Sequence, residues 1–167
     1  MEICLVRHAI AVERGTPGYE DDSRRELTAE GRVRMIEAAA GLRRVFTPQT
    51  ILTSPLVRAA ETAEILRKAY GLGKARVCEA LASDDFDAVL RALEEVDADA
   101  VALVGHEPWM SELLSYLLTG AAGGMTATVK KGAAALVVSE GPPRPGECWL
   151  EWLSQPGMLR RMGRARI

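Results

Sequence analysis

The sequence is poor in cysteine and contains no long hydrophobic run. Its three cysteines, Cys4, Cys78 and Cys148, cannot all pair, and each lies in an apolar or strand-like stretch. Free cysteine in such a stretch behaves as a small hydrophobic residue, so we expect a reducing, cytoplasmic environment. No window approaches the roughly 18 apolar residues of a membrane span, and the first residues contain no basic leader. We therefore expect neither secretion nor insertion into a membrane.

A strong excess of one charge is also missing. The chain has 21 Lys and Arg residues against 23 Asp and Glu residues, and 48% of its residues are hydrophobic. This balance argues against a basic nucleic-acid-binding protein and against a disordered chain. A length of 167 residues allows one domain with a real core and leaves little room for a second. We expect a single globular domain over residues 1–167, with no nucleic-acid partner.

Several well-known catalytic motifs do not occur. His106 begins the segment His-Glu-Pro-Trp-Met, which is not the H-E-x-x-H motif of zinc proteases, and two histidines are a thin set of metal ligands. Cys4 has no arginine six positions on, where a thiol phosphatase loop would need it, and no P-loop for nucleotide binding is found. We expect no metal ion and no other cofactor.

What the sequence does contain is an alternation of short apolar runs and helical patterns. Runs typical of strands lie directly before His8, at Thr50 to Thr53, around Val77 and at Ala100 to Val104. Helical patterns follow from Thr28 to about Val45, from Ser54 to near Gly71, from Asp84 or Asp85 to Glu95, and from Glu107 onward. This order predicts an α/β fold, a three-layer α/β/α sandwich around a mostly parallel sheet.

The end of the chain has a different pattern. The apolar runs Ala133 to Ser139 and Glu147 to Leu153 are joined by a turn rich in proline and glycine, and predict a C-terminal antiparallel hairpin added to the sheet. Apolar residues occupy successive positions in the second run, so we expect both of its faces to be largely covered. The segment Arg160 to Arg166 is typical of a solvated basic tail.

Two of the predicted helices have clear start signals. Thr28 is suited to cap the first helix, and Ser54 with Pro55 is typical of an N-cap followed by the first helical position. Val33, Ile36, Ala40 and Leu42 have helical spacing and predict an apolar face on the first helix.

The two histidines each follow an apolar run. His8 comes after Ile3-Cys4-Leu5-Val6-Arg7, and His106 comes after Ala100 to Gly105. Because the carboxyl ends of parallel strands gather ligands at one edge of the sheet, we expect both imidazoles and the segment Ser54 to Arg58 to converge there. The alternative is two unrelated histidines, one capping a turn and one hydrogen-bonded in the core.

Arginines accompany these histidines. Arg7 is adjacent to His8, and Arg58 falls in the first turn of a helix, whose dipole also favours anions. The hypothesis is a phosphate pocket in which neutral His8 attacks phosphorus in line, Arg7, Arg58 and His106 stabilise the oxygens, and water hydrolyses the phosphohistidine formed. We expect a backbone carbonyl to accept the other N–H of His8, because the attacking nitrogen must be unprotonated.

Three segments, in order, resemble the signatures of the histidine phosphatase superfamily, which has the phosphoglycerate-mutase-like fold. They are Leu5-Val6-Arg7-His8-Ala9, Thr53-Ser54-Pro55-Leu56-Val57-Arg58-Ala59-Ala60-Glu61-Thr62-Ala63 and Val104-Gly105-His106-Glu107-Pro108. The short length, the segment Arg25-Glu26-Leu27-Thr28-Ala29-Glu30-Gly31 and the ending Trp149-Leu150-Glu151-Trp152-Leu153 are most similar to the SixA-type phosphohistidine phosphatases.

The resemblance implies that His8 is the nucleophile. It implies that Arg7, Arg58 and His106 bind the phosphoryl group, with Arg25 and Ser54 as further substrate-binding residues. For Arg25 an equally good interpretation is a salt bridge within its loop, to Asp21 or Asp22.

One position departs from the superfamily pattern. Larger members place a glutamate proton donor just after the third strand, where this chain has Leu81-Ala82-Ser83. Asp84 and Asp85 follow as candidate general acids, although each is also suited to cap the next helix. General acid catalysis contributes roughly 10²- to 10⁴-fold, so its loss would penalise phosphate esters more than P–N bonds.

Three hypotheses follow from these residues. The first is a cytoplasmic phosphohistidine phosphatase acting on a phosphohistidine-containing protein of the histidine-phosphotransfer or phosphocarrier type. The second is a small-molecule phosphomonoesterase with Asp84 or Asp85 as its acid. The third is a module that binds phosphoproteins without turnover, and an intact nucleophile argues against it.

Overall fold

A mixed six-stranded sheet forms the centre of the protein, whose computed structural model describes residues 1–165. The strands are β1 (Glu2–Arg7), β2 (Thr50–Thr53), β3 (Arg76–Val77), β4 (Ala100–Gly105), β5 (Ala134–Val138) and β6 (Trp149–Ser154), in the spatial order β3-β2-β4-β1-β5-β6. The first four pair in parallel, and β5 and β6 are added as an antiparallel hairpin. The predicted α/β class and the predicted hairpin are confirmed.

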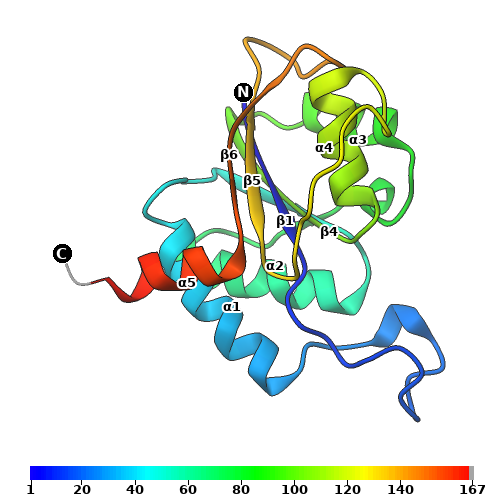
Figure 1. Cartoon of the computed structure of the whole chain (residues 1–167), viewed down its shortest axis with the longest axis vertical. Coiled ribbons are helices and arrows are strands. Elements are labelled where there is room, and N and C mark those ends of the chain that lie inside the picture. Colours follow the sequence, from blue (N-terminus) through cyan, green and yellow to red (C-terminus); the bar gives the residue numbers. More distant parts are fainter. Residues whose placement is uncertain (166–167) are drawn as a thin grey trace.

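Helices cover both faces of this sheet (Figure 1). One face packs against α1 (Ala29–Leu42), α2 (Val57–Tyr70) and α5 (Pro156–Arg164), and the other against α3 (Phe86–Glu94) and α4 (Trp109–Thr119). Two short 3₁₀ helices, η1 (Asp22–Arg24) and η2 (Glu79–Ala82), lie in the connections. No helix within residues 1–165 is long and apolar enough to cross a membrane.

β1 is a central strand and is buried on both sides. Ile3 and Leu5 belong to the core beneath α3 and α4, whereas Cys4 and Val6 belong to the core beneath α1, α2 and α5. This is why the strand is a continuous apolar run rather than an alternating one. The thiols of Cys4, Cys78 and Cys148 are free and buried, as expected.

The two predicted helix starts have different outcomes. Thr28 caps α1 as predicted, because its Oγ1 accepts the N–H of Gly31 (2.9 Å). The prediction for Ser54 is wrong, since α2 begins at Val57 with Leu56 as its N-cap. The N–H of Ser54 still donates to the Val104 carbonyl (2.9 Å). Ser54 therefore belongs to the end of the sheet, not to the helix.

The apolar face predicted for α1 is wrong except at Leu42, which is buried, whereas Ala40 is exposed. Val33 and Ile36 are 60% and 58% exposed, and the buried face is made by mostly small residues: Gly31, Met35, Ala38, Ala39, Gly41 and Leu42. Small residues are needed because α5 packs closely there, and a Cβ on Gly41 would lie 1.8 Å from the Leu159 carbonyl oxygen.

This packing overturns the expectation of a solvated basic tail. Most of the segment Arg160 to Arg166 lies in α5, whose Arg164 is paired with Glu37 of α1 (2.7 Å); Arg166 lies outside the described residues. The expectation that both faces of the last strand are covered is wrong too. β6 is an edge strand, and Trp149 and Leu150 are 44% and 38% exposed.

Candidate active site

The two histidines lie side by side at the carboxyl ends of neighbouring strands. β1 and β4 are adjacent in the sheet, and the N–H of His8 donates to the Gly105 carbonyl (3.0 Å), directly before His106. The imidazole centroids are 5.2 Å apart, and both residues are buried. The two imidazoles therefore share one site, and the alternative of two unrelated histidines is wrong.

The His8 ring is held in one orientation by the backbone. Its Nδ1 lies 2.7 Å from the carbonyl oxygen of Ala9, so the tautomer assigned here carries a proton on Nδ1 and a lone pair on Nε2. The predicted backbone carbonyl is thus present. Burial lowers the pKa of His8 to about 3. The hydrogen bond to Ala9 opposes this shift, and the nearby His106, Arg58 and Arg7 each lower the pKa by a smaller amount. His8 is neutral across the physiological range.

A buried threonine links this segment to α2. The N–H of Ala9 donates to Oγ1 of Thr62 (3.1 Å), and Thr62 donates in turn to the Arg58 carbonyl (2.7 Å). The end of β1 and the first turns of α2 are thereby fixed to one another. Sequence reasoning missed Thr62, although a polar residue in an alanine-rich helix turn was a usable signal.

His106 is held by a side chain instead. Its Nε2 lies 2.6 Å from Oγ of Ser54, which also accepts the N–H of Leu56 (3.3 Å). The simplest assignment is that the Ser54 hydroxyl donates to Nε2 and that Nδ1 carries the ring proton. Burial lowers the pKa of His106 to about 3, with the Arg58 charge as the next cause.

Arg7 and Arg58 bring positive charge to the same edge. Nη1 of Arg7 donates to the Val129 carbonyl (2.7 Å), which fixes the guanidinium against the loop before β5. Nη1 and Nη2 of Arg58 donate to the backbone carbonyl (2.8 Å) and Oδ2 (3.0 Å) of Asp22. Burial lowers the pKa of both guanidinium groups from a very high starting value, and they remain charged.

Arg25 binds the same aspartate, Asp22, as Arg58 does. Its Nε donates to Oδ1 of Asp22 (2.9 Å), and its Nη1 donates to the Val12 carbonyl (2.7 Å). The loop salt bridge considered for Arg25 therefore exists, to Asp22 and not to Asp21. Since Asp22 also holds Arg58, the salt bridge places Arg25 next to Arg58, and the substrate-binding role of Arg25 stays a prediction.

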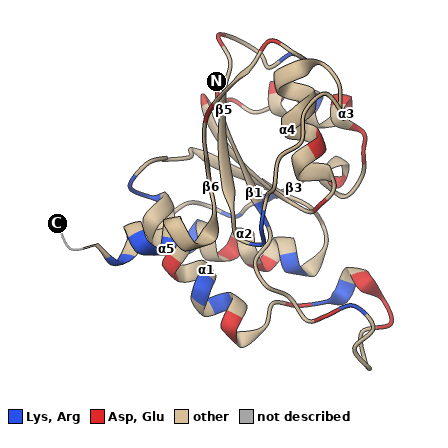
Figure 2. Cartoon of the chain, viewed as in Figure 1, with Lys and Arg blue, Asp and Glu red and all other residues tan. Residues whose placement is uncertain are grey.

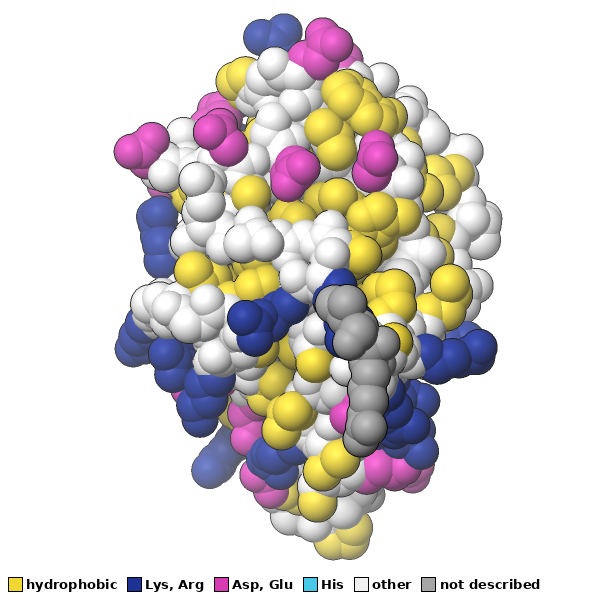
Figure 3. Space-filling view, turned by 90° about the vertical axis from the view of Figure 1, so that its left-hand side faces the viewer, with side chains coloured by type: hydrophobic (Ala, Val, Ile, Leu, Met, Phe, Trp, Pro, Cys, Tyr) yellow, Lys and Arg dark blue, Asp and Glu magenta, His cyan; other side chains and the backbone are white. Residues whose placement is uncertain are grey.

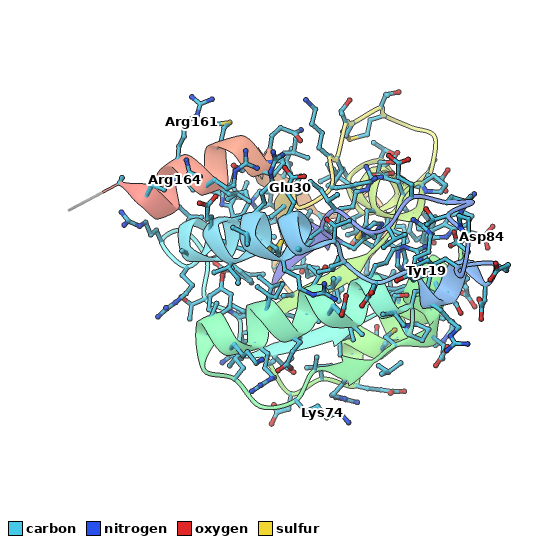
Figure 4. All side chains as sticks on the ribbon, turned by 90° about the horizontal axis from the view of Figure 1, so that it is seen from below. Tyr19, Glu30, Lys74, Asp84, Arg161 and Arg164 are labelled. Atoms are coloured by element: carbon cyan, nitrogen blue, oxygen red, sulfur yellow. The ribbon has the colours of Figure 1, made fainter. Side chains whose placement is uncertain are left out.

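Asp84 and Asp85 are not brought into this cluster. Oδ1 of Asp85 accepts the N–H of Ala88 (2.9 Å) as the N-cap of α3, so the capping alternative is confirmed for Asp85. Asp84 is exposed, and Figure 4 shows it at the margin of the molecule, on the same side as Tyr19. No hydrogen bond or salt bridge in the described chain joins either carboxylate to His8, His106, Arg7 or Arg58.

A different carboxylate lies next to the cluster. Glu107 follows His106 directly, and its charge opposes the lowering of the pKa of Arg7 that burial causes. Oε2 of Glu107 accepts a hydrogen bond from Ser111 (2.6 Å), whereas Oε1 is buried with no hydrogen-bond partner among residues 1–165. The sequence analysis quoted Glu107 within a motif but gave it no role.

The cluster has the character of an anion site. Three of its buried nitrogens have no acceptor in the described part of the protein, namely Nε of Arg7, Nε of Arg58 and Nδ1 of His106. Buried donors without partners are costly, and an oxyanion would satisfy them. Figure 2 shows acidic residues around α3 and α4 and many basic residues on α1, α2 and α5. On the face seen in Figure 3, basic side chains spread over the lower half and no described histidine is visible.

Comparison with known proteins is consistent with this chemistry. A family model of the histidine phosphatase superfamily (branch 1) matches residues 3–88. An uncharacterized protein of Picosynechococcus sp. is 38% identical over 128 residues, which cover 74% of this chain and 76% of that protein.

Solved structures show the same fold. The protein histidine phosphatase SixA, complexed with tungstate, has a TM-score of 0.78 at 24% identity and covers 94% of this chain and 98% of its own. A mycobacterial glucosyl-3-phosphoglycerate phosphatase, in a complex with VO3, has a TM-score of 0.66 at 20% identity, with 92% and 99% covered. One fold thus accommodates a protein phosphatase and a small-molecule phosphatase.

Proposed function

Because this chain belongs to the histidine phosphatase superfamily (branch 1) and is by that membership a phosphatase, we propose that it hydrolyses phosphohistidine on a protein. The observation that carries the proposal is the neutral, backbone-held His8 beside two arginines and a second neutral imidazole. The partner is a phosphohistidine-containing protein of the histidine-phosphotransfer or phosphocarrier type.

The first chemical step is attack by His8. Nε2 of His8 bonds to phosphorus while the P–N bond of the substrate breaks, and the departing imidazole nitrogen keeps the electron pair and takes a proton from water. Arg7 and Arg58 offer their Nε–H groups to the oxygens that gain charge, and His106 offers its Nδ1–H. Donors fixed before the reaction stabilise that charge without reorganisation.

The second step is hydrolysis of the phosphorylated His8. A water oxygen bonds to phosphorus, the electron pair of the P–N bond returns to Nε2, and the water proton goes to solvent. The hydrogen bond from Nδ1 to the Ala9 carbonyl is present throughout, so His8 starts and finishes the cycle as the same tautomer.

The leaving group distinguishes this substrate from a phosphate ester. An imidazole leaves more readily than an alkoxide, which needs a positioned proton donor worth roughly 10²- to 10⁴-fold. Asp85 is committed to the cap of α3, and Asp22 is held ionised by its arginines. Neither carboxyl group is suited to protonate a leaving alkoxide, which supports a P–N substrate.

The test compares three substrates with the wild type and His8→Ala. We expect a phosphohistidine-bearing protein to be dephosphorylated in preference to p-nitrophenyl phosphate and a phosphoserine peptide, and we expect the activity to vanish in the variant. Equal or better turnover of the two esters would reject the phosphohistidine assignment. Binding without turnover of any substrate would instead leave a phosphoprotein-binding module.

One observation favours a second candidate, a small-molecule phosphomonoesterase. The buried, unpartnered Oε1 of Glu107 lies beside the cluster and provides a carboxyl group that a leaving alkoxide could use. The Glu107→Gln variant tests this role, with Asp84→Asn and Asp85→Asn as matched controls. If Glu107→Gln slows phosphoserine hydrolysis by about 10²-fold and leaves phosphohistidine hydrolysis unchanged, Glu107 is the acid and esters are substrates.

A further inference from the structure

Asp22 accepts four hydrogen bonds from three arginine side chains. Its Oδ1 accepts from Nε of Arg14 and Nε of Arg25 (both 2.9 Å), and its Oδ2 accepts from Nη2 of Arg58 (3.0 Å). Its backbone carbonyl accepts from Nη1 of Arg58 (2.8 Å). These bonds run from the exposed loop before α1 to the first turn of α2, so one aspartate joins the loop to the helix.

Arg58 depends on Asp22 for its orientation. The Arg58 side chain is 6% exposed, and both hydrogen bonds recorded for it in residues 1–165 go to Asp22. A buried guanidinium is stable only when charge and hydrogen bonds compensate its desolvation. A bidentate grip also fixes the plane of the guanidinium, which a single contact would leave free to rotate.

The hydrogen bonds between Asp22 and the two arginines leave other N–H groups of these arginines free to bind a second anion. Asp22 uses one N–H on each terminal nitrogen of Arg58, so the second N–H on each and the buried Nε–H stay uncommitted. Arg25 uses Nε and Nη1, which leaves Nη2. The same arginines can therefore bind Asp22 and a phosphoryl group at once.

The charges of the site agree with an aspartate that stays in place. Four arginines are positive (Arg7, Arg14, Arg25 and Arg58), Asp22 and Glu107 are negative and both histidines are neutral, which leaves an excess of two positive charges. A phosphoryl group on an amino acid carries about 1.5 to 2 negative charges near neutral pH. Departure of Asp22 would leave one cation without a counterion.

We propose that Asp22 is a positioning residue of the phosphatase reaction, whose carboxylate orients Arg58 and Arg25 toward the phosphoryl oxygens and fastens the loop of residues 13–26 to the site. The inference rests on the proposed function in its chemistry and deepens it. The opposite role is a placeholder, in which the carboxylate occupies the phosphoryl position and has to leave before substrate binds.

The two roles predict opposite effects of Asp22→Asn. For a positioning residue, kcat on phosphoimidazole falls about 10- to 100-fold and inorganic phosphate inhibits less strongly, because the arginines no longer hold their geometry. For a placeholder, phosphate inhibits more strongly and kcat does not fall. Either of these last two results would overturn the proposal.

Asp21→Asn is the matched control. Asp21 is the neighbouring carboxylate, but it accepts only from the N–H (2.9 Å) and Oγ (2.6 Å) of Ser23, and an asparagine can cap the same turn. We expect its kcat and its inhibition by phosphate to stay within about twofold of the wild type, as for a surface change away from special features. A loss equal to that of Asp22→Asn would show that the loop is merely sensitive to substitution.

A double-mutant cycle separates positioning from simple structural support. If Asp22 acts through Arg58, Asp22→Asn changes kcat by less than about threefold in an Arg58→Ala background, because its partner is already gone. If the decreases in kcat caused by Asp22→Asn and Arg58→Ala instead multiply in the double variant, the positioning role of Asp22 is rejected. Should the asparagine variant fold poorly, Asp22→Glu is a second test, because it keeps the negative charge and displaces it by one methylene. A kcat equal to that of the wild type in Asp22→Glu would argue against geometric positioning.

Failure of this proposal and failure of the proposed function give different results. Binding of inorganic phosphate to wild type, Asp22→Asn and Asp21→Asn can be followed by calorimetry without any turnover. A wild type that binds phosphate but does not hydrolyse phosphohistidine would contradict the proposed function alone. Unchanged or tighter phosphate binding in Asp22→Asn would contradict the role of Asp22 alone.

Discussion

The site has two halves that are built by different means. Arg7, His8 and His106 lie at the ends of central strands of a buried parallel sheet, where backbone carbonyls hold Arg7 and His8 and the Ser54 hydroxyl holds His106. Asp22 and Arg25 lie in or next to the short helix η1 of an exposed loop, and side-chain ion pairs fix them. The sheet itself therefore places the proposed nucleophile, whereas the proposed binding of the phosphoryl oxygens depends on a polar network that solvent and substitution can reach.

Replacement of His8, the proposed nucleophile, is expected to have the largest effect on the strand-end half. We expect His8→Asn to lower single-turnover hydrolysis of phosphoimidazole by at least about 10³-fold, since knockout of a covalent nucleophile removes the route and not just one contact. Acid-quench trapping of a phosphorylated enzyme measures the same step. A variant that still forms the covalent species would show that another residue is the nucleophile.

Arg58 belongs to both halves, so its substitution shows how strongly they are joined. We expect Arg58→Ala to reduce kcat by on the order of 10²-fold, as the loss of one positioned donor to a developing charge does in other enzymes. Arg58→Lys keeps the charge but not the two-nitrogen fork of the guanidinium. We expect it to restore less than half of the decrease in log kcat that Arg58→Ala causes. Full recovery by lysine would mean that charge alone matters and that the fork held by Asp22 does not.

The two halves respond to acid over different pH ranges. Burial lowers the pKa of His8 and His106 to about 3 in the folded protein, from 6.5 in the unfolded chain. Between these values the unfolded state binds more protons, so the free energy of unfolding falls as the pH drops below 6.5. Each histidine lowers the free energy of unfolding by about 2 kcal/mol at pH 5 relative to neutral pH. The stability that the Asp22 ion pairs contribute is fully present above pH 3.8 and is lost only as the pH falls further, because Arg14, Arg25 and Arg58 lower the pKa of Asp22 from 3.8 despite partial burial.

Urea unfolding at pH 7 and pH 5 measures this difference. We expect His106→Asn to lose less stability between the two pH values than the wild type, by about 2 kcal/mol, because one buried imidazole has been removed. Asp22→Asn is the control, and its loss over that interval stays that of the wild type. An unchanged loss in His106→Asn would mean that His106 does not stay neutral in the folded state.

Arg14 is expected to give the smallest effect. It donates to Asp22, yet its side chain is 80% exposed, and exposed ion pairs contribute little. We expect Arg14→Ala to raise KM about twofold at low salt and not at all in 0.5 M salt, where surface charges are screened. A tenfold rise that persists in high salt would make Arg14 a substrate ligand and extend the loop half beyond Arg25.

The sequence predicted the strand-end half well, and for a physical reason. A strand buried on both faces must be a continuous apolar run, so Arg7 and His106 were visible as the points where such runs stop. The same pattern predicted the parallel strands and the hairpin. Motif resemblance and strand-end logic agreed on His8, and both rest on short-range sequence information.

What the sequence could not predict depends on contacts between distant segments. Ser54 has the composition of a helix cap, but its backbone continues the sheet and its hydroxyl serves His106. The buried face of α1 is made of small residues because α5, more than a hundred positions later, packs against it. The sequence offered Asp21 and Asp22 as equal partners for Arg25, and only the folded loop distinguishes them.

The place of β1 in the sheet bears on how this enzyme emerges from the ribosome. His8 is made well before Gly105 and Gly132, yet its N–H bonds to the Gly105 carbonyl, and the N–H of Gly132 bonds to the carbonyls of both Arg7 and His8. Such non-local pairings form late and slowly. A nascent chain that has emerged only as far as residue 88 carries His8 without β4, β5 or His106. The cluster around His8 can therefore assemble only after β4 and β5 have been made, as a property of the whole sheet.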